Sequence, residues 1–572
     1  MVNSVARLSC VAVAVAALWG CAPQSANQTD PSSDAPAAVS GTETGLGAYL
    51  AGRYAQSHGD TRAAAEYYAT AARRDRDNID LQQRAFTLLL AEGRLEEAAP
   101  MAERLLIIDE EAALPLLMMG VRDIRDGQFD AAEKRFARLP HKGINGFLGP
   151  LLTAWARAGQ GNMETALKSL APRTDTAGFA PIYEFHAGLI AELNGKDALA
   201  EKHYKAALAA QTSVRTVEAV GAFHQRAGRM DAAAELYRRY YTEHNDRSLL
   251  DGRRQLAAGT TLPRAVDSAA AGLAEAMFDT ASLVRQGNAH DLALVFSRLA
   301  LALRPDFPLA QVLVADTLGQ QRRLAEANAV YRAIDPASQV AGFARMRLAL
   351  NQDETGDTDG AISELKTLAA ERPDSFDALM SLGDVMRRHK RFDEAAEAYD
   401  QAITRAARLG DAGIWQLYYA RGIALERSRQ WPKAEADFFE ALRLKPDQPD
   451  VLNYLGYTWV DQGINLDKAR KMIQRAVELR PNDGAIVDSL GWALYRMGEF
   501  QAAVKQLERA AELKAEDPTI NEHLGDALWQ VGRFDEARYQ WQRAMILDPE
   551  PEQVEALKAK ISTGQPPATP SR

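Results

Sequence analysis

DSLGWALYRMGEFQAAVKQLERA, residues 488–510, is followed 34 residues later by a near copy of itself, EHLGDALWQVGRFDEARYQWQRA at residues 522–544. Each stretch reads as an amphipathic helical hairpin. Its first helix carries a glycine, and alanines stand where bulky side chains would be expected. The same hairpin written twice at a fixed interval predicts a repeat architecture.

The pattern runs through most of the chain. A small residue eight places into each unit recurs mostly at intervals of 34 residues, with one exception: Gly52, Phe86 (the exception), Gly120, Ala154, Gly188, Ala222, Ala281, Ala315, Ala349, Gly383, Gly422, Gly456, Gly491 and Gly525. An alanine follows each of them twelve places on, once displaced by one residue: Ala64, Ala98, Ala132, Ala166, Ala200, Ala234, Ala293, Ala327, Ala361, Ala395, Ala434, Ala469, Ala503 and Ala537. Small residues at these places let two helices cross closely, so we expect fourteen hairpins.

A 34-residue period with this signature resembles the tetratricopeptide repeat. The resemblance implies an all-α superhelical solenoid of about fourteen helical hairpins, in which each hairpin buries its apolar face against its neighbours. The units and their short inserts cover residues 45–551, which leaves no room for an independent catalytic domain. We expect an N-terminal array at 45–248, an irregular insert or hinge at 249–273, a C-terminal array at 274–551, and a capping helix with a disordered tail at 552–572.

The N-terminus has the features of an export signal. A short basic start and an apolar run too short to span a membrane precede the motif LWGC, which ends at Cys21 and resembles the bacterial lipobox. Trp19 departs from that motif, which prefers a small residue, and an ordinary secretory signal is the alternative. We expect a signal peptide at 1–20, a lipid on Cys21 and a flexible tether to residue 44. Because Ala22 and not Asp follows the cysteine, we expect attachment to the outer membrane, facing the periplasm.

Charge and composition argue against several kinds of chemistry. The formal net charge is −10 and the isoelectric point about 5.6, whereas a nucleic-acid surface needs clustered Lys and Arg. The nine histidines show no metal-binding spacing, and no phosphate loop or nucleophile constellation stands out. We therefore expect no nucleic-acid partner, no metal, no cofactor and no enzymatic activity. A catalytic site hidden in the groove or in the insert is the least favoured alternative.

The concave surface of such a solenoid is the expected binding surface. First-helix positions 2, 5, 9, 12 and 13 of each unit form most of it. In the last four units these positions include aromatic and polar residues, namely Tyr419, Asn453, Tyr457, Asp488, Trp492, Tyr495, Glu522 and Trp529. Aromatic side chains with polar tips suit the recognition of an extended peptide or a partner helix. The alternative is that some of them only pack between neighbouring hairpins.

The C-terminal units resemble a narrower group. Together with the lipobox and tether, the stretch NYLGYTWVDQGINLDKARKMIQRAVELRPNDGAIVDSLGWALYRMGEFQAAVKQLERA, residues 453–510, is similar to Gram-negative outer-membrane repeat lipoproteins that act as adaptors for a periplasmic carboxyl-terminal processing protease. This resemblance implies a scaffold that binds the protease and presents clients such as cell-wall hydrolases. Lipoproteins of the same architecture also serve in polysaccharide export and outer-membrane assembly, and that function is the alternative.

Overall fold

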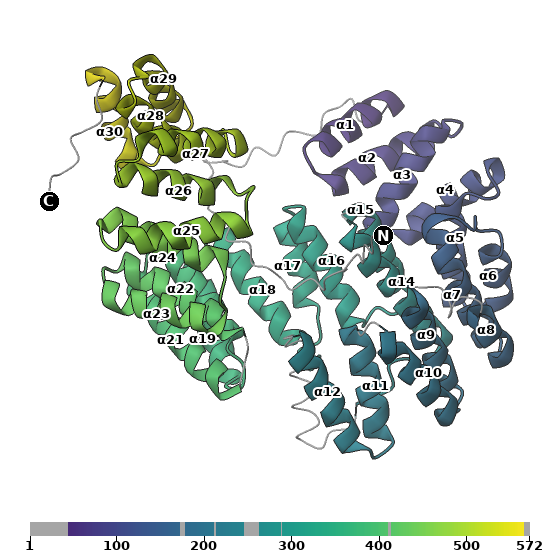
Figure 1. The fold of residues 1–572 in the computed structure, drawn as a ribbon. Helices are drawn as coiled ribbons and strands as arrows, with labels where there is room; N and C mark the ends of the chain where they lie inside the picture. Colours follow the sequence, from purple (N-terminus) through teal and green to yellow (C-terminus); the bar gives the residue numbers. More distant parts are fainter. Residues whose placement is uncertain are drawn as a thin grey trace, which may run out of the picture. The chain divides into compact units, whose positions relative to one another are not determined.

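The computed structural model describes residues 44–171, 178–210, 213–244, 262–287, 289–409 and 413–564. The regular elements in these ranges are helices, and 29 of them are α-helices (Figure 1). In chain order they make fourteen consecutive pairs, followed by the single helix α30. The prediction of an all-α solenoid of about fourteen hairpins is confirmed. The expected signal peptide, Cys21, the tether up to residue 43 and the tail from residue 565 lie outside the described residues.

The chain divides into two compact units, residues 1–351 and 352–572. The helices of the first unit are α1 (Gly45–Ser57), α2 (Thr61–Arg74), α3 (Ile79–Ala91), α4 (Leu95–Ile108), α5 (Ala113–Arg125), α6 (Phe129–Phe136), α7 (Gly143–Gly159), α8 (Met163–Leu170), α9 (Ala180–Leu193), α10 (Asp197–Ala210), α11 (Val214–Arg226), α12 (Met230–His244), α14 (Ala269–Gln286), α15 (His290–Leu303), α16 (Pro308–Gln320), α17 (Leu324–Arg332) and α18 (Ala341–Glu354), which ends just past the boundary. The helices of the second unit are α19 (Thr358–Glu371), α20 (Asp377–Arg388), α21 (Phe392–Leu409), α22 (Ile414–Arg427), α23 (Trp431–Leu444), α24 (Pro449–Gln462), α25 (Leu466–Leu479), α26 (Gly484–Arg496), α27 (Phe500–Leu513), α28 (Pro518–Gln530), α29 (Phe534–Ile546) and α30 (Pro551–Thr563).

Small residues hold each hairpin together at the crossing of its two helices. A Cβ atom added to Gly188 in α9 would lie 2.4 Å from the ring of Tyr204 in α10, so no side chain larger than hydrogen fits there. Thirteen of the fourteen alanines named above are fully buried. The hairpin therefore forms from contacts between residues close in sequence, which is why the repeat spacing predicts it.

The sixth hairpin, α11 and α12, is one residue out of the expected register. Gly221, and not Ala222, lies against the ring of Tyr237, at 2.3 Å from an added Cβ. Correspondingly Ala233 is fully buried, whereas Ala234 is exposed. The expected pair Ala222 and Ala234 is therefore wrong by one position. Spacing alone cannot separate two adjacent small residues such as Gly221 and Ala222.

Two element boundaries differ from the expected ranges by a few residues. Helix α14 begins at Ala269, where the Ser268 side chain accepts a hydrogen bond from the Ala271 amide, so the last part of the expected 249–273 insert is helical. Helix α30 begins at Pro551 and closes the C-terminal end of the repeat array. Its own residue Leu557 is fully buried. Residues 245–261 lie outside the described residues.

Candidate partner-binding groove

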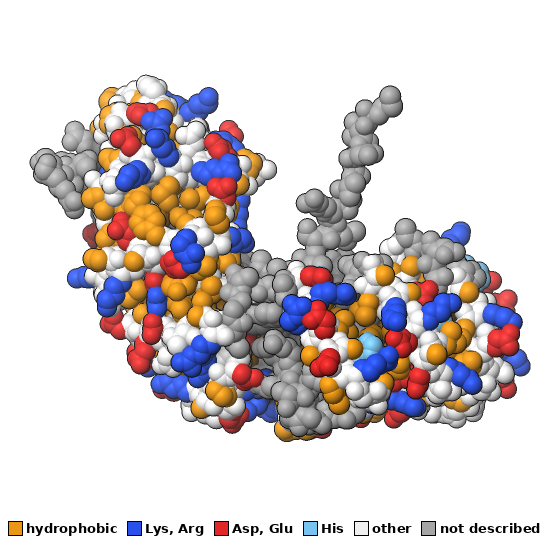
Figure 2. Space-filling view, turned by 60° about the horizontal axis from the view of Figure 1, so that its bottom comes forward, with side chains coloured by type: hydrophobic (Ala, Val, Ile, Leu, Met, Phe, Trp, Pro, Cys, Tyr) orange, Lys and Arg blue, Asp and Glu red, His pale blue; other side chains and the backbone are white. Residues whose placement is uncertain are grey.

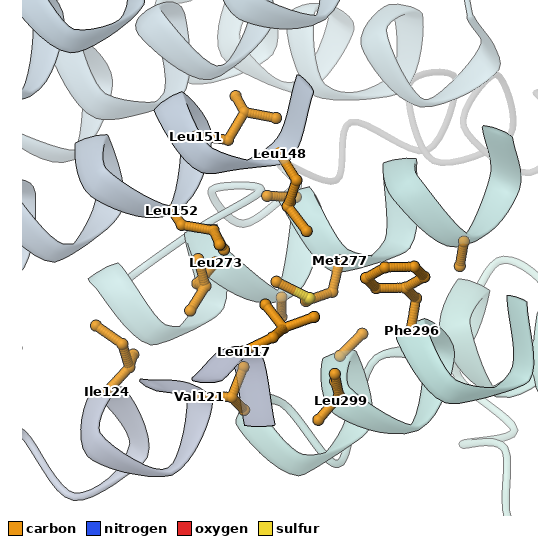
Figure 3. Close-up of a cluster of buried hydrophobic side chains, with 14 of the residues drawn as sticks. Leu117, Val121, Ile124, Leu148, Leu151, Leu152, Leu273, Met277, Phe296 and Leu299 are labelled. Atoms are coloured by element: carbon orange, nitrogen blue, oxygen red, sulfur yellow. The ribbon is translucent and has the colours of Figure 1, made fainter. Parts of the chain in front are cut away.

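Groove positions of α5 and α7 in the first unit are buried by its own helices. Helices α14 and α15 lie inside the arc of the first twelve helices, where α14 packs against α7 and α9, and α15 against α3 and α5 (Figure 1). Figure 3 shows side chains at groove positions of α5 and α7 converging with side chains of α14 and α15: Leu117, Val121, Ile124, Leu148 and Leu151 with Leu273, Met277, Phe296 and Leu299. All of them are almost completely buried. This groove is therefore filled by the chain itself.

Polar contacts fix α14 in that place. The indole N–H of Trp155 in α7 donates to Nδ1 of His186 in α9 at 3.0 Å, and Nε2 of His186 lies 3.1 Å from Oδ2 of Asp279 in α14. Because an indole can only donate, Nδ1 accepts and Nε2–H donates to Asp279. A Cβ atom on Gly272 would meet the Trp155 ring at 2.2 Å, so α14 rests directly on that ring.

A buried carboxylate adds to this attachment. Glu275 in α14 is completely buried and accepts hydrogen bonds from Arg215 of α11, one of them 3.0 Å long from Nε. Arg304, just after α15, lies 3.3 Å from the same carboxylate. Burial lowers the pKa of Arg215, but Glu275 and Glu218 outweigh that effect and the net pKa is raised. A buried ion pair of this kind makes the position of α14 specific, because moving the helix would take the buried Glu275 away from both of its arginine partners.

The groove positions of the second unit remain open. Tyr419, Asn453, Tyr457 and Trp492 are half-buried, and only Asp488 and Tyr495 among the expected groove residues of α26 are buried. Figure 2 shows hydrophobic side chains gathered on the surface of this unit, at the left of the view, between charged side chains. The two units thus use the same helical positions differently: the first covers those of α5 and α7 with its own helices, and the second leaves Tyr419, Tyr457 and Trp492 partly accessible.

Trp492 is the centre of an aromatic stack. Its indole stacks on the Tyr495 ring, with centroids 4.8 Å apart and planes 10° apart. It also stacks on the imidazole of His523 in α28, with centroids 4.1 Å apart and planes 13° apart. A flat, partly accessible aromatic surface held on both flanks is pre-organised for a partner side chain, because little rotamer entropy is left to lose on binding.

The histidine of the stack is held by a carboxylate one turn before Trp492. Nδ1 of His523 lies 3.0 Å from Oδ1 of Asp488, and both side chains are buried. Burial lowers the pKa of His523, but the charge of Asp488 and its hydrogen bond outweigh that effect, so the net pKa is raised above the ordinary value. Sequence reasoning missed His523, because it stands at a position that packs on the preceding hairpin. A titratable residue at a packing position is the signal that could have revealed it.

Two groove tyrosines and an asparagine extend the site toward α22. Tyr419 packs edge-on against Tyr454, with ring centroids 6.0 Å apart. Burial raises the pKa of Tyr457, and the carboxylates of Asp488 and Asp461 raise it further. Oδ1 of Asn453 is buried and has no hydrogen-bond partner within the described ranges.

The last two expected groove residues belong to other contacts. Trp529 packs against Phe534 and Trp541 of its own hairpin, at centroid distances of 4.4 and 5.7 Å. Glu522 is bound by the capping helix, because Nζ of Lys560 lies 2.7 Å from its carboxylate. The structure therefore brings Asp488, Trp492 and Tyr495 together and leaves Trp529 and Glu522 outside the stack.

A second buried polar network joins the capping helix α30 to the last hairpin, α28 and α29. Lys560 also donates to Asp526 at 2.7 Å, and Trp541 Nε1 donates to the other oxygen of Asp526 at 2.9 Å. Burial raises the pKa of Asp526, and this effect exceeds the opposite influence of Lys560. Helix α30 is thus bound to α28 by charge as well as by apolar packing.

Among the described residues, no group of three or more His, Cys, Asp and Glu side chains is placed to hold a metal ion. None of the helices in the described ranges has the length and apolar character needed to cross a membrane.

Comparisons with known proteins agree with the repeat architecture. Residues 346–410, 419–484 and 489–552 match the tetratricopeptide repeat family. The TPR repeat-containing protein PA4667 of Pseudomonas aeruginosa is 29% identical over 181 residues, which cover 26% of this chain and 30% of that protein. The chain thus aligns with less than a third of the length of this relative.

Similarities to solved structures are weak. Yeast Tom70 matches with 14% identity over 91% of this chain and 95% of that chain, at a TM-score of 0.36. The structure of pilF from Pseudomonas aeruginosa matches with 19% identity over 38% of this chain and 97% of that chain, at a TM-score of 0.33. A tetratricopeptide repeat protein from Parabacteroides merdae matches with 13% identity over 51% of this chain and 98% of that chain, at a TM-score of 0.34.

Proteins built from these repeats bind other proteins and are generally non-catalytic scaffolds. The described residues form a tetratricopeptide-repeat solenoid, and three stretches in its C-terminal part match the tetratricopeptide repeat family.

Proposed function

We propose that this protein is a non-catalytic adaptor, anchored by a lipid on Cys21 to the periplasmic side of the outer membrane, that brings a carboxyl-terminal processing protease and its client proteins together. The observation that carries the proposal is the contrast between the units. In the first unit the groove positions of α5 and α7 are buried beneath α14 and α15, whereas in the second unit Tyr419, Tyr457 and Trp492 are aromatic and partly accessible. This contrast supports the second unit as the place where a partner polypeptide binds.

The chemistry of the groove favours an extended polypeptide as its ligand. An apolar partner side chain would pack against the accessible part of the Trp492 side chain. The hydroxyls of Tyr419 and Tyr457 offer hydrogen bonds along the same groove. Aromatic anchors of this kind commonly account for about 2 kcal/mol or more each in protein interfaces.

Photo-cross-linking from the groove tests the partner. A photoreactive phenylalanine analogue at Ile423, a half-buried groove position, should trap the bound protein in cells, and mass spectrometry should identify a periplasmic processing protease or its cell-wall hydrolase clients. Trp492→Ala should abolish the cross-link. Tyr539→Ala is the matched control, because Tyr539 is an exposed aromatic on a second helix. Trapping of polysaccharide-synthase or membrane-assembly subunits instead would refute the protease assignment.

Membrane anchorage is tested separately. Cys21→Ser should release the mature protein from the membrane fraction or leave its precursor uncleaved. Normal processing with unchanged membrane fractionation would rule out the lipid anchor.

A further inference from the structure

The first helix of the chain presents an apolar face to solvent. Leu46, Leu50 and Tyr54 follow one another at intervals of four residues, so they lie along one side of α1. Their exposed fractions are 70%, 53% and 67%. At the places corresponding to Leu50 and Tyr54, the last hairpin has His523 and Ala527, and both are buried beneath the preceding hairpin. The apolar face of α1 has no preceding hairpin to cover it.

The C-terminal end of the repeat array, in contrast, is covered by a helix. There α30 closes the stack, Leu557 is fully buried, and Lys560 binds the carboxylates of Glu522 and Asp526. Terminal repeats of a solenoid need a cover, because each hairpin leaves one apolar face for a neighbour. Within the described residues the C-terminal end has this cover, and α1 lacks it.

The position of α1 in the chain indicates what covers it. The helix begins at Gly45, and 23 residues, which we expect to act as a tether, separate it from Cys21. A flexible chain of 23 residues has a typical end-to-end distance of about 26 Å. If Cys21 carries a lipid, α1 is therefore the element of the folded chain held closest to the membrane.

The chemistry of α1 fits a phospholipid surface. The helix has no acidic residue and carries one cation, Arg53, so anionic headgroups meet no repelling carboxylate on it. Leucines on one face suit the boundary between headgroups and acyl chains, and a tyrosine suits the headgroup level, because its ring is apolar and its tip is polar. The Tyr54 ring stacks on His58 with centroids 4.0 Å apart, which holds it on the same side of the helix.

We propose that the face of α1 formed by Leu46, Leu50 and Tyr54 rests on the phospholipid surface to which the chain is tethered. This contact orients the repeat array relative to the membrane, a constraint that a flexible tether alone does not give. The proposal rests on the membrane anchorage proposed above. Its test uses a lipid-free chain, so it succeeds or fails independently of lipidation and of the groove partner.

Vesicle flotation provides that test. The full mature chain carrying Cys21→Ser is mixed with vesicles of phosphatidylethanolamine and phosphatidylglycerol. It should bind them, and the triple variant Leu46→Ser, Leu50→Ser, Tyr54→Ser should bind at least about tenfold more weakly, because apolar insertion drives the contact. The control variant Ile107→Ser, Ile546→Ser removes two residues that are 84% and 81% exposed elsewhere, and it should bind like the parent. Binding should persist at high salt, which screens purely electrostatic attraction.

A second measurement guards against a misfolded variant. In Leu50→Trp, the emission of the new tryptophan should shift to the blue when vesicles are added, which reports burial of that face without removing the stripe. Absence of vesicle binding by the parent, equal binding by the triple variant, or an unshifted emission would each overturn the proposal. Self-association of the parent that the triple variant abolishes, with no vesicle binding, would identify the face as a contact between two copies of the chain and would equally overturn it.

Discussion

The indole of Trp492 lies face to face with the imidazole of His523, with ring centroids 4.1 Å apart and ring planes 13° apart. The two residues belong to consecutive hairpins, so the stack joins the groove surface to the contact between repeats. Asp488, on the same helix as Trp492, binds the imidazole from the side. The shape of the groove therefore depends on a titratable group that no partner needs to touch.

The stability of the second unit should depend on pH through His523. Its pKa is raised in the folded state, because Asp488 outweighs the effect of burial. The folded state thus binds this proton more tightly than the unfolded state. The stabilisation is present in full below the ordinary histidine pKa of about 6.5 and is lost as the pH rises through the folded-state pKa. Thermal unfolding followed across this window should show a falling melting temperature.

His523→Gln isolates that effect. The variant keeps a polar side chain of similar size but cannot titrate, so the part of the slope due to His523 should disappear. An identical slope in the variant and in the parent would assign the pH dependence to other groups.

The two groove tryptophans should respond differently to truncation. Trp492→Ala should weaken partner capture by about 2 kcal/mol or more, because it removes an accessible aromatic anchor. Trp529→Ala should mainly lower the melting temperature of the second unit, because Trp529 packs on Phe534 and Trp541 of its own hairpin. Capture and thermal unfolding are measured on both variants. Loss of stability without loss of capture in Trp492→Ala would mean that its role is packing.

The spacing of small residues predicted the hairpins well, because they form locally. Position 188 must be glycine because the Tyr204 ring crosses it, and the two residues are only 16 apart in the sequence. The same logic failed by one position at Gly221 and Ala222, where two small residues compete for one crossing. Local patterns therefore predict that a hairpin forms, but they do not predict which of two adjacent small residues lies at the helix crossing.

The filled groove of the first unit could not be predicted from repeat spacing. Helices α14 and α15 have the same hairpin pattern as every other pair, and nothing in a 34-residue period shows that a hairpin docks inside the arc of earlier ones. A signal was nevertheless present in the groove positions themselves. Leu117, Val121 and Leu151 occupy them in the first unit, whereas Tyr419, Tyr457 and Trp492 do so in the second. Aliphatic residues at such positions indicate burial, but an aromatic residue does not by itself indicate access, because Trp155 stands at a groove position of α7 and is fully buried.

Glu275→Ala should strongly destabilise the first unit. It would remove the fully buried carboxylate that binds both Arg215 and Arg304, and Arg215 would keep Glu218 alone. Removing one partner of a buried ion pair costs about 3 to 5 kcal/mol, and we expect a loss toward the lower end of that range because Glu218 remains. Replacing Glu275 and Arg215 together by methionine should recover part of the loss, because both of these charges are then gone, although Glu218 and Arg304 each lose a partner. Chemical denaturation followed by circular dichroism measures both variants.

A surface pair in the same unit provides the control for Glu275. Glu235 and Arg238 are an exposed ion pair three residues apart on one helix. Glu235→Ala should leave the denaturation midpoint nearly unchanged, since exposed pairs contribute little. Equal effects of Glu275→Ala and Glu235→Ala would contradict the role assigned to α14.

Two glycine-to-alanine substitutions in the first unit should have opposite effects on stability. Alanine favours a helix over glycine by about 1 kcal/mol wherever its methyl group fits. At Gly319 in α16 the nearest atom to an added Cβ is 4.0 Å away, so Gly319→Ala should stabilise the unit. At Gly188 the methyl group would lie 2.4 Å from the Tyr204 ring. The Tyr204 ring is buried, and its hydroxyl donates to Glu192 at 2.6 Å. The ring also makes an edge contact with the Phe223 ring, so it has little room to move. Overpacking costs about 1 to 3 kcal/mol and should exceed the propensity gain, so Gly188→Ala should lower the melting temperature. A rise in melting temperature for both variants would show that the helices of α9 and α10 can separate without loss, and would remove the physical basis assigned here to the small residue at the eighth position of each repeat.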